Sequence, residues 1–144
     1  MQTPFEQYDS YISEAFSEQY WCDVGGESAE EILETFTDRD WAALTAAWPN
    51  RPPQWVERMA YTLSGVEPSR SVPLLSAIVN QCEMRSLGTV ACSLRALDDA
   101  SLVAALDETG NRRLAEAARL ENQIYRHELE DVLDRWSKLM HPGG

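Results

Sequence analysis

Carboxylates crowd one short stretch of the sequence, GGESAEEILETFTDRDW at 25–41. Arg39 is the only basic residue there, beside Glu27, Glu30, Glu31, Glu34, Asp38 and Asp40. Carboxylates can hold a metal ion, transfer protons or contact a basic protein. They can also serve only to solvate an exposed helix. The other residues of the chain decide between these uses.

The two histidines do not form a metal site with these acids. His127 and Glu128 begin a pattern like the HExxH of zinc hydrolases, but Asp131 stands where the second histidine belongs. A di-iron bundle needs a glutamate three residues before each ligating histidine, and neither His127 nor His141 has one. We therefore predict no metal and no cofactor.

Other motifs for catalysis are missing as well. The sequence contains no GxSxG nucleophile motif and no glycine-rich phosphate loop. The acidic pairs at 38–40 and 98–99 lack the spacing of a calcium-binding loop, and helix capping explains both. Cys22, Cys82 and Cys92 form no CxxC pair, which favours packed, reduced thiols. We predict no catalytic residues and no enzyme activity.

The negative charge is concentrated at one end of the chain. Of the net charge of −12, residues 1–40 contribute −10, from eleven acidic residues and one basic residue. Such a field repels nucleic acid and anionic lipid and steers basic proteins toward it. We therefore predict a basic protein partner, no nucleic acid and no membrane. The N-terminus, MQTPFEQYDS, has no signal-peptide pattern, so a cytoplasmic location is expected.

Apolar residues recur at helical spacing along the chain, and no strand-like alternation of useful length appears. We predict a single all-α domain over 1–144, built from about seven or eight helices in antiparallel hairpins. Residues 1–40 are expected to form acidic N-terminal helices and 110–140 one long C-terminal helix. The inward stripe of that long helix is Leu114, Ala118, Glu121, Tyr125, Leu129, Val132, Trp136 and Leu139.

The acidic N-terminal region is predicted to start with a helix from Pro4 that stops before Gly25-Gly26, since paired glycines break regular structure. Its apolar stripe is Phe5, Tyr8, Ile12, Ala15, Phe16 and Tyr20, with Glu14 and Glu18 on the face toward water.

A second helix is predicted to open with a capping box of Ser28 and Glu31. Its apolar residues, Ala29, Ile32, Leu33 and Phe36, fall on one side, and Glu30, Glu31 and Glu34 fall together on the other. Asp38 is expected to cap the third helix.

The run SVPLLSAIVNQCEMRSLGTVACSLRALDD (71–99) resembles a HEAT-type helical repeat. It has a proline near a helix start, a Leu-Leu-x-x-Ile core, a loop, and a second apolar helix closed by Asp98. With the preceding helix the resemblance extends over 52–108. It implies stacked helix pairs that share one core.

Trp21 allows two interpretations. Projected on the first helix it points with Glu14, away from the apolar stripe and beside Cys22 and Asp23. An exposed tryptophan beside carboxylates is typical of a protein-interface hot spot. Alternatively, the helix ends before Trp21 and its ring folds back onto the protein.

In its small size, acidity, tryptophan content and HEAT-like pattern, the chain resembles the immunity proteins of bacterial polymorphic toxin systems. The toxins of these systems are delivered by contact-dependent or type VI secretion. The resemblance implies a protein that neutralises a cognate secreted toxin domain by occluding its basic active-site or substrate-binding surface. The expected contact residues are Glu14, Glu18, Trp21, Glu27, Glu30, Glu31, Glu34, Asp38 and Asp40, or else the repeat-like helices.

Two other functions stay open. An acidic cytosolic chaperone or adaptor for a secreted protein has the same size and charge, but it would bind a targeting segment instead of a folded toxin. An all-α hydrolase that reverses a toxin's modification would lose protection when two separated carboxylates are changed, while still binding its partner.

Overall fold

Helices follow one another along the whole described chain. The computed structural model describes residues 2–14, 17–120 and 124–143, without the side chains of Glu18, Cys22 and Asp23. No strand occurs in these residues, so the prediction of an all-α fold is confirmed. The helices are α1 (Pro4–Ile12), α2 (Glu18–Tyr20), α3 (Gly26–Leu33), α4 (Asp38–Ala47), α5 (Pro53–Leu63), α6 (Pro68–Gln81), α7 (Leu87–Arg95), α8 (Asp99–Ala105), α9 (Glu108–Leu120) and α10 (Arg126–Met140). Because α2 runs into α3, the described residues form nine helices, close to the seven or eight expected.

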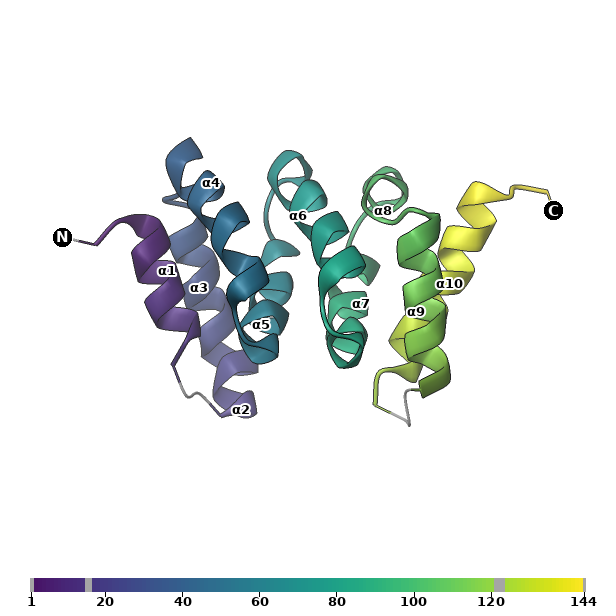
Figure 1. The fold of residues 1–144 in the computed structure, drawn as a ribbon, viewed down its shortest axis with the longest axis horizontal. Helices are drawn as coiled ribbons and strands as arrows, with labels where there is room; N and C mark the ends of the chain where they lie inside the picture. The colour runs from purple at the N-terminus through teal and green to yellow at the C-terminus, as the bar shows by residue number, and fades with distance from the viewer. Residues whose placement is uncertain (1, 15–16, 121–123, 144) are drawn as a thin grey trace.

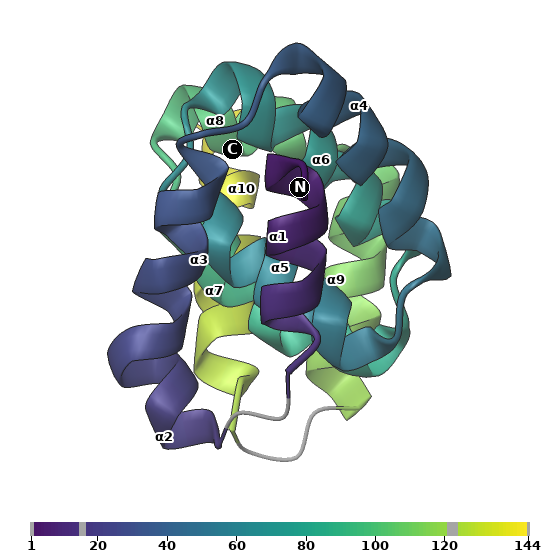
Figure 2. The same cartoon turned by 90° about the vertical axis from the view of Figure 1, so that its left-hand side faces the viewer.

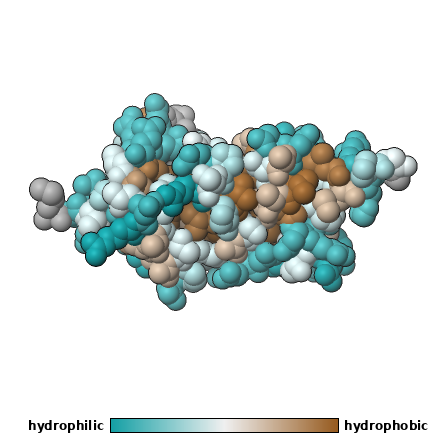
Figure 3. All heavy atoms as spheres, turned by 90° about the horizontal axis from the view of Figure 1, so that it is seen from above, coloured by the Kyte–Doolittle hydropathy of each residue, from teal (hydrophilic) through white to brown (hydrophobic). Residues whose placement is uncertain are grey.

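The helices are arranged along one axis in the order of the sequence, with the termini at opposite ends (Figure 1). Helices α3, α5, α7 and α10 lie side by side in one layer, since each packs on the next. Helices α6 and α9 lie in a second layer, and α1 and α4 pack together at the N-terminal end (Figure 2). Seen from above, hydrophilic residues line the edges of the molecule and hydrophobic ones gather in its middle and toward the C-terminal end (Figure 3).

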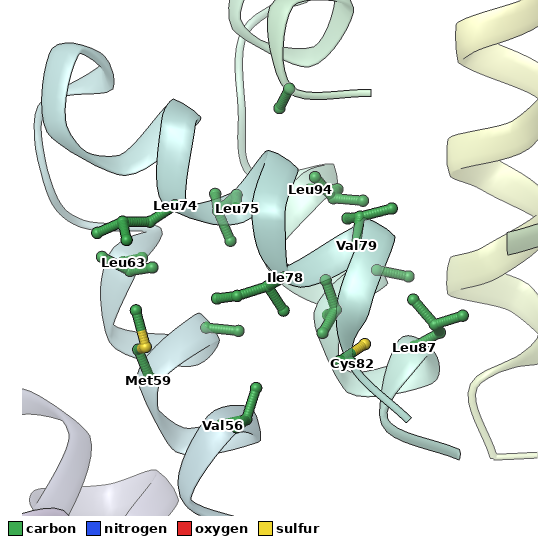
Figure 4. Packing of buried hydrophobic residues seen from close by; sticks show 14 of the residues in the cluster. Val56, Met59, Leu63, Leu74, Leu75, Ile78, Val79, Cys82, Leu87 and Leu94 are labelled. Carbon is green, nitrogen blue, oxygen red and sulfur yellow. The ribbon is translucent and has the colours of Figure 1, made fainter. Parts of the chain in front are cut away.

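The core lies between the two layers. The apolar face of α5, which includes Met59 and Leu63, is buried throughout. Figure 4 shows Leu63 beside Leu74 of α6, and Ile78 of α6 extending toward the α5 side chains. Leu87 and Leu94 continue the buried core on α7. Burial of such a side chain contributes about 1.5–3 kcal/mol relative to leaving it exposed. This shared core holds the α5 and α7 surfaces in fixed relative positions.

Gly25 and Gly26 do not end a helix, contrary to the prediction. A π-helical turn (Trp21–Gly25) joins α2 to α3, so Ser28 lies inside the helix and no side chain caps its start. A Cβ atom on Gly26 would lie 2.5 Å from the ring of Tyr61, and one on Gly25 would lie 2.8 Å from the ring of Trp21. The two glycines therefore serve close packing of aromatic rings inside a continuous helix.

The first helix is also shorter than predicted, because α1 ends at Ile12. The guanidinium of Arg58 donates to the carbonyls of Ile12 and Glu14 and so satisfies the end of the helix. Tyr20, expected on the apolar stripe, is 44% exposed. Ala15 and Phe16, also assigned to that stripe, lie outside the described residues.

Asp38 does not cap α4. The N-cap is Thr37, whose hydroxyl accepts from the Asp40 N–H, while the Asp40 carboxylate accepts from the Thr37 N–H at 2.9 Å. This is a capping box, which typically stabilises a helix by about 1 kcal/mol. Asp98 caps α8 as predicted, accepting from the Ser101 N–H at 2.7 Å.

The long C-terminal helix is instead two helices, α9 and α10, packed on each other. Folding back lets both halves of the stripe cover the core: Leu114, Leu129, Val132 and Trp136 are all buried. The turn fits there because Tyr125 packs against Gly88 of α7, where a Cβ atom would lie 2.6 Å from the Tyr125 Cβ. Glu121, part of the predicted stripe, lies outside the described residues.

We expect Gly88→Ala to lower the free energy of unfolding by about 1–2 kcal/mol, because the added methyl group meets the Tyr125 Cβ and ring instead of a movable chain end. Chemical denaturation measures the change. Gly65→Ala is the matched control, since its Cβ would meet only the flexible carboxylate end of Glu30 at 3.3 Å. Equal stability of Gly88→Ala and wild type would show that α9 and α10 are not held in this way.

Candidate protein-binding surface

Helix α3 has one docked face and one acidic face, as predicted. Ala29 and Leu33 are buried, whereas Glu27, Glu31 and Glu34 are exposed. Glu27, Glu30, Glu31 and Glu34 lie at helical spacing on one side of the helix, and we call them the α3 carboxylate face. Glu30 is the exception in exposure, because its carboxylate is half-buried against Gly65, just after the end of α5.

In the part of the chain that the structure describes, no cation compensates the α3 carboxylate face. Among the described residues, none of its four glutamates forms an ion pair or a side-chain hydrogen bond. Some acidic residues elsewhere are paired, as Asp9 is with Arg51 and Asp99 is with Arg135. Like charges at this spacing destabilise a helix by a few tenths of a kcal/mol per pair. The face is therefore an electrostatic cost that no contact within the described protein offsets.

Glu30 carries the clearest sign of this cost. Burial, followed by the charges of Glu27 and Glu34, raises the pKa of the Glu30 carboxyl. A cation placed on the α3 carboxylate face would act in the opposite direction and favour the ionised form. The face is thus suited to a Lys or Arg side chain supplied from outside.

We expect Glu30→Gln to stabilise the protein at pH 7. Since the pKa of Glu30 is raised on folding, its contribution to stability is greatest well below pH 4.5 and is lost as the pH rises through the raised value. The neutral amide of the introduced glutamine does not ionise, so the variant avoids this loss of stability at pH 7. In strongly acidic solution Glu30 is protonated as well, and the variant should no longer be more stable than wild type. Thermal denaturation of both proteins across this pH range measures the effect. Glu130→Gln, at an exposed site on α10, controls for loss of a charge. If Glu30→Gln were no more stable than wild type at pH 7, ionised Glu30 would not carry the electrostatic cost described here.

Asp38 and Asp40 have different surroundings. Asp38 is exposed and pairs with Arg70, whose guanidinium lies over the Trp41 ring. Asp40 is buried and accepts hydrogen bonds from Thr37 and from the Phe5 N–H. The Thr37 N–H is the main cause that lowers the Asp40 pKa. Asp40 is thus a structural residue that fixes α1 on α4, and its assignment as a contact residue is corrected.

Trp21 folds back onto the protein, so the exposed hot-spot interpretation is wrong. Its side chain is 7% exposed, its ring centroid lies 5.9 Å from that of Tyr61, and the Arg58 guanidinium lies 5.2 Å above it. The side chain of Glu14 is exposed next to this site, and its carbonyl accepts from Arg58. Glu18 begins α2, but its side chain lies outside the described part of the structure.

A groove of about 320 Å³ opens beside the α3 carboxylate face, between α5 and α7. Its lining is Trp21, Gln54, Glu57, Arg58, Tyr61, Thr89, Cys92 and Tyr125, and we call it the α5–α7 groove. The Glu57 carboxylate on its wall accepts from the hydroxyls of Ser86 and Thr89. Apart from Trp21, no lining residue was predicted individually, although most of them belong to the repeat-like helices, the alternative contact surface. The groove forms only when α2–α3, α5, α7 and the α9–α10 turn come together, and no local pattern signals that.

A second groove, of about 330 Å³, lies between α4 and α6. The Asp38–Arg70 ion pair and the stacking of Arg70 on Trp41 occupy its edge. Its charges are satisfied within the protein, in contrast to those of the α3 carboxylate face. The α3 carboxylate face, together with the α5–α7 groove, is therefore a stronger candidate for a binding surface than the groove between α4 and α6.

Metal and thiol chemistry find no support in the described residues. They contain no group of three or more His, Cys, Asp or Glu side chains placed to hold a metal ion. Cys82 is buried and Cys92 exposed, and both are free thiols, so the expectation that all are packed is wrong for Cys92. The side chain of Cys22 lies outside the described residues. None of the described helices is both long and apolar enough to cross a membrane.

Comparison of the chain with protein-family models, with curated proteins and with solved structures finds no match. Its function therefore has to be argued from the surface itself.

Proposed function

We propose that this protein is an immunity protein, which binds a cognate secreted bacterial toxin domain and occludes the toxin's basic active-site or substrate-binding surface. The α3 carboxylate face carries the proposal. Its four glutamates have no cationic partner among the described residues, and the pKa of Glu30 is raised by burial and by its neighbours. A basic surface supplied by a partner would relieve that repulsion.

The fold supports a role in binding. We propose that the paired helices form a HEAT-like arrangement, whose stacked hairpins share one continuous core. The helices packed through that core present α3, α5 and α7 as one rigid layer. A surface that is ordered before binding loses little conformational entropy in the complex, which favours tight association.

We propose that the glutamates act by contact and not by catalysis. A catalytic carboxylate needs a second group in reach, a base, an acid or a metal, to work with. The four glutamates instead stand on one helix face with no histidine, lysine or arginine bound to them in the described structure. The partner is a basic protein, and the proposed place of action is the cytoplasm, where the toxin arrives.

The test is co-expression of the wild-type protein with its toxin domain, which we propose to be the C-terminal domain of a large secreted protein encoded beside this one. We expect the domain alone to stop cell growth and the co-expressed protein to restore it. A one-to-one complex should be isolated from the rescued cells by size exclusion.

Three results would contradict the proposal. Growth that is not restored, or restored without a complex, would exclude neutralisation by binding. Binding to an N-terminal targeting segment of the large protein, and not to its folded C-terminal domain, would identify a chaperone instead.

A further inference from the structure

We infer that the α5–α7 groove receives a bulky apolar side chain from the same basic partner whose cationic residues contact the α3 carboxylate face. The inference rests on the proposed function and specifies the chemistry of the partner: a basic segment that carries one large apolar or aromatic anchor.

The groove and the α3 carboxylate face lie on neighbouring helices, since α3 packs on α5. Gly26 of α3 lies so close to the Tyr61 ring that a Cβ atom would be 2.5 Å away, and Glu27 follows directly in the sequence. Tyr61 and Trp21, whose rings are in contact, both line the groove. Glu27 is therefore one residue away from a contact with the groove lining, which places one partner segment within reach of both.

The lining selects an apolar side chain over a second cation. Three aromatic rings, those of Trp21, Tyr61 and Tyr125, border the groove. Arg58 lies over Trp21 and brings a positive charge to the same wall, which offsets the negative charge of Glu57. The Glu57 carboxylate also accepts from the hydroxyls of Ser86 and Thr89, so the groove offers a lysine or arginine no unpaired carboxylate. The volume of about 320 Å³ has room for one large side chain. An aromatic-lined pocket with charges at its rim is the usual arrangement of an interface hot spot.

The rim already exposes apolar surface. Tyr61, which lines the groove, is 37% exposed. Tyr20 and Val24 do not line it but lie within three residues of Trp21 in the sequence, and they are 44% and 45% exposed. Large exposed apolar side chains that gather beside a charged surface mark a contact region more often than scattered single ones do. Together with the charge complementarity of α3, they favour a protein partner over a small polar ligand.

Two measurements on the complex with the toxin domain test the inference. The first uses Gln54→Trp, which fills the groove from an exposed position in the first turn of α5. We expect it to weaken binding by about tenfold or more, mainly through faster dissociation. Gln81→Trp, at the exposed end of α6, is the matched control and should bind like wild type.

The second measurement is alkylation of Cys92 by iodoacetamide in a Cys22→Ser background. Cys92 lines the groove and is exposed, whereas Cys82 is buried. We expect Cys92 to react in the free protein and to be protected in the complex.

The outcomes separate the two proposals. Suppose that wild type binds the toxin domain, that Gln54→Trp binds it equally well, and that Cys92 stays reactive in the complex. The groove is then empty in the complex, and only this inference fails. If wild type does not bind the toxin domain, both proposals fail. If Cys92 is protected at high concentration without the partner, a second copy fills the groove, which also overturns the inference.

Discussion

Trp136→Ala is expected to lower the free energy of unfolding by about 3–5 kcal/mol. The side chain is 7% exposed, and its indole N–H donates to the Leu106 carbonyl at 2.7 Å. The substitution leaves a large cavity between α10 and the end of α8 and leaves a buried carbonyl without a donor. Both effects act in the same direction. Urea denaturation followed by circular dichroism measures the loss.

Met140→Ala is the matched control, because Met140 lies on the same helix but is 44% exposed. Its stability should stay within about 0.5 kcal/mol of wild type. If Trp136→Ala were as stable as Met140→Ala, α10 would not be docked on the core as described.

Arg58→Met is expected to cost about 2–3 kcal/mol, although methionine restores much of the apolar contact. Arg58 is 6% exposed, and it donates to the carbonyls of Ile12 at 2.9 Å and Glu14 at 2.6 Å. Without it, the end of α1 loses two charge-assisted hydrogen bonds and Trp21 loses the cation above its ring. Burial lowers the pKa of the Arg58 guanidinium, because removing the charge from water is unfavourable. This desolvation offsets part of the stabilisation that the hydrogen bonds provide.

Arg112→Met, at an exposed site on α9, is the control and should change stability little. The loss in Arg58→Met should be accompanied by a change in tryptophan fluorescence, since Trp21 lies against Arg58. A variant with wild-type stability and fluorescence would show that α1 does not depend on this arginine.

The fold class could be predicted because it depends on local periodicity. The capping role of Asp98 could also be predicted, because an aspartate just before a helix accepts from the N–H groups of the first turn. The wrong predictions concern long-range packing. Gly25-Gly26 end helices in most contexts, but here the rings of Trp21 and Tyr61 occupy the space beside them. Tertiary contact overrides the local preference.

The candidate site also contains features that depend on one helix and features that depend on long-range packing. The acidic face of α3 could be predicted from helical spacing, because Glu30, Glu31 and Glu34 need only one helix to come together. The burial of Asp40 depends on the Phe5 N–H, 35 residues away. The α5–α7 groove needs four separate segments. Neither could be read from a pattern within one helix.

The association rate of the toxin domain with a charge-reversed α3 tests the proposed binding surface most directly. Glu27, Glu31 and Glu34 are exposed, so changing all three to Lys should leave the fold nearly as stable as wild type. The control changes Glu108, Glu130 and Asp134 to Lys, which alters the net charge equally but on α9 and α10.

We expect the α3 variant to associate about tenfold or more slowly at low salt and to lose most of the salt dependence of the wild-type rate. The control should keep both the rate and its salt dependence much closer to wild type. Equal rates and equal salt dependence for the α3 variant and wild type would contradict the proposal, because the α3 carboxylate face would then be only a solvated surface.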